Sequence, residues 1–446
     1  MAGRFSSRSG APPGGIWVCL LPLMTLASAC ASQMTEFSPG VDLDRAEMMH
    51  RVRVLSAPEL AGRGNGTQAA LAAADSIALW FGLAGLQPGA GADGWFQDFV
   101  LQGDGLAGKT ARNVVGMQSG RGRLTGRWVV VGAHYDHLGR ADSVFTDFDV
   151  PEPGAYYPGA DDNASGVTIL VELAQLACRS VGDSEPDGTE PPLRSCLFVS
   201  FAGEEVGIQG SAYLVKHLPV PRDSIDVMIN LDSVGRLRER RLFVAGVGTA
   251  ADLPRLVRNA NRDSLQLELS QGGWDASDHV SFNTIEVPVL FLFTGAQPDY
   301  HLPTDTWQHI DAANLVRVAG YTWRLLTDLR SLPVALAYQD VGEISSRPEP
   351  PGTRPERKAW LGAIPDFTEQ VQGVMLAGVI ADSPAESVGL IKGDILMGVA
   401  GEPVHDLADF AQILRSCEPG QQVRVLISRE GRQLTFDVIL ADRADR

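Results

Sequence analysis

The feature that most constrains the fold is an alternation, from about residue 42 to residue 335, of short apolar runs with segments whose apolar residues recur every three to four positions. Short apolar runs predict buried strands, and the three-to-four spacing predicts helices packed on them. Strands that alternate with helices form a mostly parallel sheet covered on both faces. We therefore expect an α/β domain built on a mostly parallel mixed sheet flanked by helices.

Four strands and four helices are the clearest predicted elements. The strands span residues 127–134, 196–203, 226–232 and 287–295. The helices span residues 165–177, 209–218, 250–265 and 312–332. Loops converge at the carboxyl ends of parallel strands, so that edge of the sheet is where a ligand site is expected.

A second domain is expected, because 446 residues exceed what one ordinary core accommodates. Residues 345–358 are rich in Pro and charge and lack periodicity, which is typical of an exposed linker. We place the first domain at residues 42–335, the linker at 336–357 and the second domain at 358–443. The formal net charge of -17 argues against nucleic acid as a partner, because phosphate binding needs clustered Lys and Arg.

Residues 1–29 are typical of a signal peptide. Arg4 and Arg8 precede an apolar stretch, residues 16–29, that is too short to span a bilayer comfortably. Cys30 directly after it resembles the lipidated Cys of a bacterial lipoprotein, although the usual Leu lies one place too early, at Leu26. We expect export to the bacterial periplasm and a lipid anchor at Cys30; the alternative is a free periplasmic or secreted protein.

Cys178 and Cys196 flank a polar segment, and none of the five cysteines has a CxxC or Cys/His metal spacing. Zinc-finger and thioredoxin chemistry therefore have no support. In an oxidising compartment the two residues can form a disulfide or remain as two buried thiols, and the sequence leaves both open.

Imidazole and carboxylate groups follow each predicted strand. A single such residue usually caps a helix or completes a hydrogen bond. Because these residues recur at successive strand ends, together they indicate a shared metal site. Nitrogen and oxygen donors without thiolates suit Zn²⁺ or another borderline divalent ion. Adjacent carboxylates at Glu204 and Glu205 repel each other, and a cation would compensate them. The groups that follow strands are His134, Asp136, His137, Glu204, Glu205, Asp232, His301 and Asp305, with Tyr300 beside His301. Asp161 and Asp162 lie just before a predicted helix.

Six blocks between residues 134 and 306 resemble the di-zinc exopeptidase family that includes bacterial leucyl aminopeptidases, aminopeptidase Y and glutamate carboxypeptidase. The resemblance covers roughly residues 50 to 330. It implies the zinc-exopeptidase fold and a metallopeptidase that hydrolyses peptides, most readily as an aminopeptidase. The blocks are "HYDHLG", "GADDNASG", "FAGEEVGIQGS", "INLDSVG", "SDHVSF" and "DYHLPTDT".

The resemblance also implies roles for single residues. His134 and Asp232 would bind one Zn²⁺ ion, Glu205 and His301 the other, and Asp162 would bridge the two.

Three more residues would carry the chemistry. Asp136 would hydrogen-bond and orient His134, Glu204 would be the general base for a water activated by the two ions, and Tyr300 would donate a hydrogen bond to the tetrahedral oxyanion. The alternative for Tyr300 is a packing tyrosine beside the cleft. A supporting place around the ligands is expected for His137, Asp278, His279 and Asp305.

The stretch "SPAESVGLIKGDILMGVAGEPV", residues 383–404, resembles a PDZ domain of the bacterial periplasmic-protease type. The resemblance implies a small, mainly β domain whose groove takes an extended peptide as an added strand. Its backbone N–H groups would hold the peptide's C-terminal carboxylate at Leu361, Gly362, Ala363 and Ile364. A domain that packs on the catalytic unit, without reading peptides, is the alternative.

Three other functions stay open. A carboxypeptidase would need a free cation for the substrate carboxylate, for which Arg112 and Arg236 are candidates. Glutaminyl cyclases share this fold but operate with one zinc ion. A non-catalytic PDZ scaffold would be expected to lack ligands, and every ligand is present in this sequence.

Overall fold

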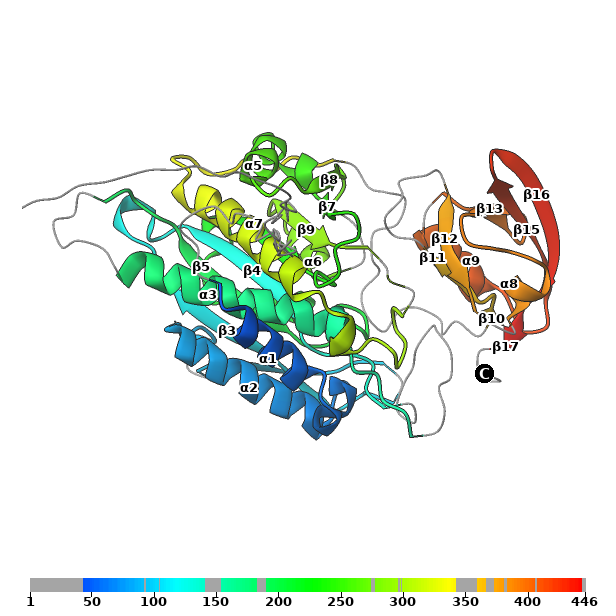
Figure 1. Ribbon diagram of the computed structural model, residues 1–446, viewed down its shortest axis with the longest axis horizontal. Helices are drawn as coiled ribbons and strands as arrows, with labels where there is room; N and C mark the ends of the chain where they lie inside the picture. Colours follow the sequence, from blue (N-terminus) through cyan, green and yellow to red (C-terminus); the bar gives the residue numbers. More distant parts are fainter. Residues whose placement is uncertain are drawn as a thin grey trace, which may run out of the picture. The chain divides into compact units, whose positions relative to one another are not determined.

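The computed structural model describes residues 43–442, apart from residues 92–93, 104, 141–153, 183–189, 274–276, 296, 298, 342–358, 366–372, 381–382 and 406. The expected signal peptide, Cys30 and residues 342–357 of the expected linker lie outside the described residues. Figure 1 shows a larger α/β part, coloured from blue to yellow, and a smaller mainly β part, coloured orange to red.

The larger part is built on a nine-stranded sheet in the order β1-β3-β5-β4-β6-β9-β7-β8, with β2 beside β3. The central strands β5, β4, β6 and β9 run parallel, whereas β3 pairs with β5 and β7 pairs with β9 in antiparallel fashion. The expected α/β class is confirmed, with a parallel centre and antiparallel edges. The strands are β1 (Gln87–Pro88), β2 (Phe96–Val100), β3 (Thr110–Gln118), β4 (Trp128–His134), β5 (Ser195–Phe201), β6 (Ile225–Leu231), β7 (Arg241–Ala245), β8 (Gln266–Leu269) and β9 (Val289–Phe293).

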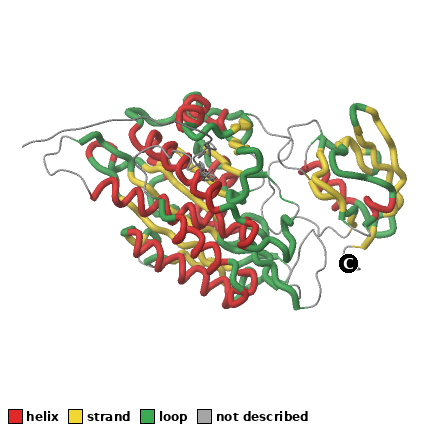
Figure 2. Tube along the Cα trace, in the orientation of Figure 1, coloured by secondary structure: helices red, strands yellow, loops and turns green. Residues whose placement is uncertain are grey.

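Helices cover the sheet because its central strands are apolar on both faces. Every residue of β5 and β6 is buried. Leu197, Val199 and Phe201 pack in one cluster with Leu214 of α4 and Phe282 of α6, whereas α3 contacts β4, β5 and β6 and lies against α1, α2 and α7 (Figures 1 and 2). The helices are α1 (Arg45–Leu55), α2 (Gln68–Ala84), α3 (Gly166–Gly182), α4 (Gln209–Lys216), α5 (Leu253–Ala260), α6 (His279–Asn283) and α7 (Ala312–Ser331).

One helix expected over residues 250–265 is shorter, because α5 ends at Ala260. The side chain of Asn261 accepts a hydrogen bond from the backbone N–H of Leu265 and donates one to its carbonyl oxygen. An Asn side chain that pairs with nearby backbone in this way competes with helical hydrogen bonds and ends the helix.

Among the described residues, one helical stretch, Ala160–Val181, is long and apolar enough to cross a membrane by length and composition. Within the fold 72% of its apolar window is buried, which is typical of a core helix. Cys178 and Cys196 are both free thiols, so the structure has the two-thiol alternative and no disulfide between them.

The smaller part has a six-stranded sheet in the order β11-β12-β13-β15-β16, with β14 beside β13, and a separate β10–β17 pair. A hydrophobic cluster of its own includes Leu396, Leu414, Val425 and Ile427. The elements are β10 (Ala359–Trp360), β11 (Ala363–Pro365), β12 (Val374–Val379), α8 (Pro384–Ser387), β13 (Ile395–Val399), β14 (Glu402–Pro403), α9 (Leu407–Ser416), β15 (Gln422–Arg429), β16 (Arg432–Ile439) and β17 (Ala441–Asp442).

The segment expected to hold a peptide carboxylate, residues 361–364, follows β10 and includes the start of β11. The carbonyl oxygens of Leu361 and Gly362 accept hydrogen bonds from the backbone N–H groups of Ala385 and Ile380. Gly362 has a positive φ of 80°, and a Cβ there would lie 2.2 Å from Ser383 Cβ. Only glycine therefore fits this turn.

Candidate metal centre

The residues expected to bind metal lie where neighbouring strands end. His134 is the last residue of β4, Glu205 follows β5, and Asp232 directly follows β6. Asp162 lies in the helical turn Ala160–Ser165 that leads into α3, and His301 lies between β9 and α7. Because β4, β5, β6 and β9 are parallel neighbours, the sheet brings their carboxyl ends to one edge.

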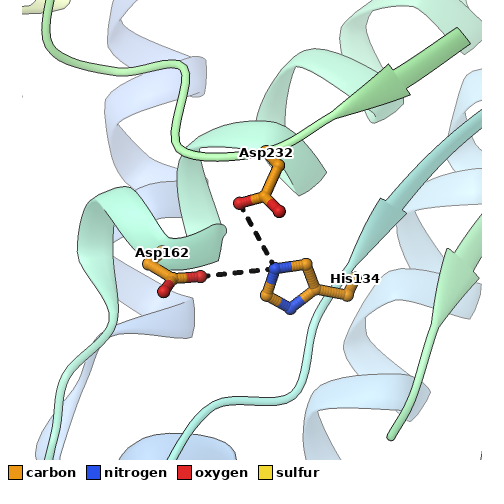
Figure 3. A group of neighbouring side chains, drawn as sticks. All are labelled: His134, Asp162 and Asp232. Atoms are coloured by element: carbon orange, nitrogen blue, oxygen red, sulfur yellow. Dashed lines mark ion pairs between the residues drawn. The ribbon is translucent and has the colours of Figure 1, made fainter. Parts of the chain in front are cut away.

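The first group of side chains contains His134, Asp162 and Asp232 (Figure 3). His134 Nε2 lies 3.3 Å from Asp162 Oδ1 and 3.4 Å from Asp232 Oδ1. Buried His134 would have a lowered pKa, but the charges of Asp232 and Glu204 and hydrogen bonds to the two aspartates raise it well above its usual value. The two carboxylates thus favour a positive charge at Nε2, the place where a metal ion would compete with the proton.

The second group of side chains that could hold a metal contains His137, Asp162 and Glu205, and so shares Asp162 with the first; His301 lies against two of its members. His301 Nε2 lies 3.0 Å from Asp162 Oδ2 and 3.3 Å from Glu205 Oε2. His301 also has a left-handed backbone conformation with φ 58°, which is unfavourable for a non-glycine residue and recurs at functional sites. Asp162 thus presents one carboxylate oxygen to each group, as a bridging ligand would.

These distances fit a zinc site. Adjacent ligand atoms around a tetrahedral Zn²⁺ lie about 3.3 Å apart when each bond is about 2.0 Å long, and the four pairs above span 3.0 to 3.4 Å. In the described part of the chain, the ion pairs of Asp162, Glu205 and Asp232 are with histidines alone. A set of carboxylates so little exposed needs further positive charge, which divalent cations would supply.

Asp136 was expected to orient His134 through its carboxylate, but it does so through its backbone carbonyl. His134 Nδ1 lies 3.2 Å from the backbone carbonyl oxygen of Asp136, whereas the nearest carboxylate oxygen is 3.9 Å away. The carboxylate instead accepts hydrogen bonds from Asn65 Nδ2 at 2.6 Å and from the backbone N–H groups of Glu204 and Glu205 at 3.3 and 3.2 Å. Because three donors already hold that carboxylate, the main chain of Asp136 orients His134.

Two further hydrogen-bond networks position the ligands: one holds the carboxylate of Asp232, and the other holds the backbone that carries Asp162. Ser277 Oγ donates to Asp232 Oδ2 at 2.8 Å, and Asn230 Nδ2 donates to Ser277 Oγ at 2.8 Å. The Asp305 carboxylate accepts the backbone N–H groups of Asp161 and Asp162 at 3.0 to 3.1 Å. Asp305 therefore fixes the turn that carries the bridging carboxylate, in line with its expected supporting place.

Arg63 supports the site although no sequence motif contains it. It is fully buried, and its guanidinium donates hydrogen bonds to the carbonyl oxygens of Leu55, Tyr135, Pro158 and Gly159 at 2.5 to 2.9 Å. Tyr135 lies in the loop after β4, Pro158 and Gly159 lie in the segment before Asp162, and Leu55 ends α1. One side chain thus joins the two loops that carry ligands to the end of α1.

The charge of Arg63 also bears on the site. Burial lowers its pKa to about 10, although Asp162, Asp305 and Asp136 attract its positive charge. The group is therefore protonated at neutral pH and contributes a buried cation behind the ligand carboxylates. Its sequence context, a polar loop rich in glycine, gave no signal, because backbone carbonyls are its partners.

Glu204 and Tyr300 are the two remaining residues with expected chemistry. Burial raises the pKa of Glu204 well above its usual value, and Glu205 and Asp232 raise it further while His134 opposes them. Tyr300 stacks on His301 with ring centroids 3.9 Å apart and lines a small pocket with Asp162. Burial, and then the charge of Asp162, raise the pKa of Tyr300 well above its usual value, so its hydroxyl stays protonated and can donate.

A mixed α/β sheet thus gathers imidazoles and carboxylates at the carboxyl ends of its parallel strands, in an arrangement suited to divalent metal ions. Comparison with known families agrees. Residues 113–326 match Peptidase family M28, and residues 360–440 match a PDZ domain. The two matches fall in the segments for which the sequence predicted a peptidase-like domain and a PDZ domain, and both resemblances are confirmed.

Individual relatives are aminopeptidases. The chain is 28% identical over 244 residues to Aminopeptidase YwaD of Bacillus subtilis (strain 168), covering 50% of this chain and 47% of that protein. It is 28% identical over 207 residues to a probable leucine aminopeptidase of Arthroderma otae, covering 44% of this chain and 54% of that protein. The chain therefore spans about half the length of these curated relatives.

A solved structure shares the fold. The structure of BSAP, a zinc aminopeptidase from Bacillus subtilis, superposes with a TM-score of 0.52 at 18% identity and covers 66% of this chain and 96% of that chain.

Proposed function

We propose that this protein is a zinc-dependent aminopeptidase that removes N-terminal residues from peptides, with two Zn²⁺ ions held by His134, Asp162, Glu205, Asp232 and His301. The observation that carries the proposal is the position of Asp162, whose two oxygens lie 3.3 Å from His134 Nε2 and 3.0 Å from His301 Nε2. In this proposal residues 42–335 form the catalytic domain and residues 358–443 the PDZ domain.

The ions would supply Lewis acidity and lower the pKa of a water from 15.7 to about 7. The Glu204 carboxylate takes a proton from the attacking water and delivers it to the departing amine. Burial raises the pKa of Glu204, and the charges of Glu205 and Asp232 raise it further, which makes its carboxylate a stronger base toward the proton of the water. The Tyr300 hydroxyl donates a hydrogen bond to the carbonyl oxygen of the scissile peptide.

The charges around the pocket favour an aminopeptidase over a carboxypeptidase. Arg112 Nε lies 2.9 Å from Asp98 Oδ1, and Arg236 is ion-paired with Asp299. Neither guanidinium is free for a substrate carboxylate. The described residues that line the pocket beside Tyr300 include no Lys or Arg. Apart from Asp299, which is ion-paired, and Asp162, a proposed ligand, the carboxylates of Asp161 and Asp305 remain to attract the ammonium of a free N-terminus.

The test is a panel of aminoacyl-anilides, free peptides and N-acetylated peptides, assayed before and after a chelator and after return of Zn²⁺. Hydrolysis of free N-termini that the chelator abolishes and Zn²⁺ restores is expected. Rapid cleavage of N-acetylated peptides would exclude an aminopeptidase. Metal analysis should give two zinc ions per chain, and a single ion with cyclisation of N-terminal Gln would indicate a glutaminyl cyclase.

We further propose export to the periplasm with a lipid anchor at Cys30, and binding of a peptide C-terminus by the segment Leu361, Gly362, Ala363 and Ile364. Support for the anchor is the sequence of residues 1–30. A Cys30→Ser variant should move from the membrane to the soluble periplasmic fraction, and an unchanged membrane fraction would exclude the anchor.

A further inference from the structure

We propose that His137 controls the affinity of the second metal position, the one beside Glu205 and His301, by holding Glu205 through a hydrogen bond. This inference rests on the proposed two-ion function. His137 lies three residues after the end of β4 and is 1% exposed. Its position in the sequence favours a supporting place, but gives neither its partner nor the ion it serves.

The two oxygens of Glu205 face different partners. Oε1 lies 2.6 Å from His137 Nδ1, and Oε2 lies 3.3 Å from His301 Nε2. The carboxylate is therefore divided between an imidazole that orients it and the position where metal would bind. A carboxylate held in this way cannot swing away from the metal position when the position is empty.

The short distance identifies His137 as a hydrogen-bond donor. His137, Asp162 and Glu205 lie close enough together to share a metal, but 2.6 Å is well below the spacing of about 3.3 Å between two ligand atoms on a tetrahedral Zn²⁺. The geometry therefore assigns a proton to Nδ1, which donates a hydrogen bond to Glu205 Oε1. A nitrogen that carries a proton does not bind metal. Nε2 of His137 has no hydrogen-bond partner within the described residues, so the bond to Glu205 alone determines which nitrogen is protonated.

The surroundings fix the imidazole ring in one orientation. Gly159 has a φ of 58°, and a Cβ there would lie 2.6 Å from both Cγ and Cδ2 of His137. The ring also meets Tyr157 and His301 edge to face, at centroid distances of 6.5 and 5.7 Å. Because the ring cannot turn, Glu205 is oriented before any ion arrives.

The matched variants are His137→Asn and His137→Leu, which have nearly the same shape. The Asn amide nitrogen occupies the place of Nδ1 and can still donate to Glu205, whereas Leu cannot. Loss of a group that orients a ligand weakens metal binding by about 10–100-fold. We expect His137→Leu to weaken the second equivalent of Zn²⁺ by this factor with the first equivalent unchanged, and His137→Asn to restore most of the loss.

The measurement is a titration of metal-free protein with Zn²⁺ against a chromophoric chelator, repeated with Co²⁺ to record the visible spectrum of the second ion. Equal second-site affinity in the wild type and both variants would overturn the inference. A His137→Asn variant as weak as His137→Leu, with an altered Co²⁺ band in both, would also overturn it, because His137 would then be a ligand. A wild type that binds one ion would instead overturn the two-ion function itself.

A second measurement uses the wild-type protein and so does not depend on whether a variant folds. In the wild-type protein with ¹⁵N-labelled histidine and Zn²⁺ bound, the His137 signals should show a protonated, hydrogen-bonded Nδ1. A proton on Nε2 with a bare Nδ1 would overturn the inference, because that tautomer belongs to a metal ligand.

Discussion

The backbone N–H of Glu204 donates a hydrogen bond to Asp136 Oδ1, with 3.3 Å between the two atoms. This contact joins the loop after β4 to the loop after β5 at the point where one supplies a metal ligand and the other the proposed base. The position of Glu204 therefore depends on a residue two places beyond His134, and a change in either loop should affect both metal binding and proton transfer.

Replacing Glu204 with Gln should remove catalysis and leave metal binding intact. Gln keeps the shape of the side chain but cannot accept the proton of the attacking water, and general base catalysis contributes about 10²–10⁴-fold. Steady-state kinetics and metal analysis of the same sample check this. Glu286→Gln, at an exposed position, is the control, and undiminished turnover of the Glu204 variant would remove Glu204 from the mechanism.

An Asp136→Asn variant should be destabilised and should lose activity. The carboxylate accepts N–H groups of Asn65, Glu204 and Glu205, and an amide would turn its own NH₂ group toward one of these donors. A buried donor left without an acceptor costs about 1–3 kcal/mol. Urea unfolding in the presence of chelator measures this cost, with Asp98→Asn at a half-exposed site as the control; equal unfolding midpoints would contradict the assigned role.

Replacing Arg63 with Met should lower both stability and metal affinity. Four buried carbonyl oxygens would lose their donor, so the loss should reach about 3 kcal/mol or more. The loops before Asp162 and after His134 would also lose their common anchor. Denaturant unfolding and zinc titration test this, with Arg222→Met, a partly exposed arginine, as the control.

Zinc should stabilise the protein, and Asp162→Ala should abolish the effect. A ligand that binds only the folded state at 100 times its Kd adds about 2.7 kcal/mol to the free energy of unfolding. Because Asp162 contributes an oxygen to both groups of donors, its loss should weaken both ions. Thermal melts with and without Zn²⁺ decide this, and a variant that Zn²⁺ still stabilises fully would contradict a shared ligand.

Acid should destabilise the protein partly through His279, which stacks on Phe291. Burial lowers the pKa of His279 from 6.5 to about 3. Between these values the unfolded chain binds a proton that the folded chain does not, so stability falls as pH falls from 6.5 toward 3 by roughly 1–2 kcal/mol per pH unit at most.

The variant His279→Phe isolates this effect. Neither ring nitrogen of His279 has a hydrogen-bond partner within the described residues, so Phe should be tolerated at pH 7. In the presence of chelator, the variant should lose less stability than the wild type between pH 6.5 and 4.5. Parallel pH profiles of the two proteins would show that His279 does not contribute.

The central strands could be predicted because their burial on both faces makes them continuous apolar runs. Strand β3 could not, because "TARNVVGMQ" mixes apolar residues with Arg112 and Asn113, which have partners elsewhere in the fold. The short helix α6, with five residues, offers too little periodicity to recognise.

Some residues of the candidate site could likewise be predicted from the sequence, and others could not. Histidines and carboxylates at strand ends carry their chemistry in the sequence, so His134, Asp162 and His301 could be named. The partners of main-chain atoms do not appear in a sequence. For that reason the carbonyl of Asp136 that orients His134, and the four carbonyls that hold Arg63, became visible only in three dimensions.

The ligand groups come from segments as far apart in the sequence as His134 and His301. They come together only when the four parallel strands have paired in the sheet. Contacts between such distant segments form late in folding, because long stretches of chain must close first. Zn²⁺ would then be captured at the end of folding and could not nucleate it. An incompletely folded chain would be recognisable by its failure to take up the ions.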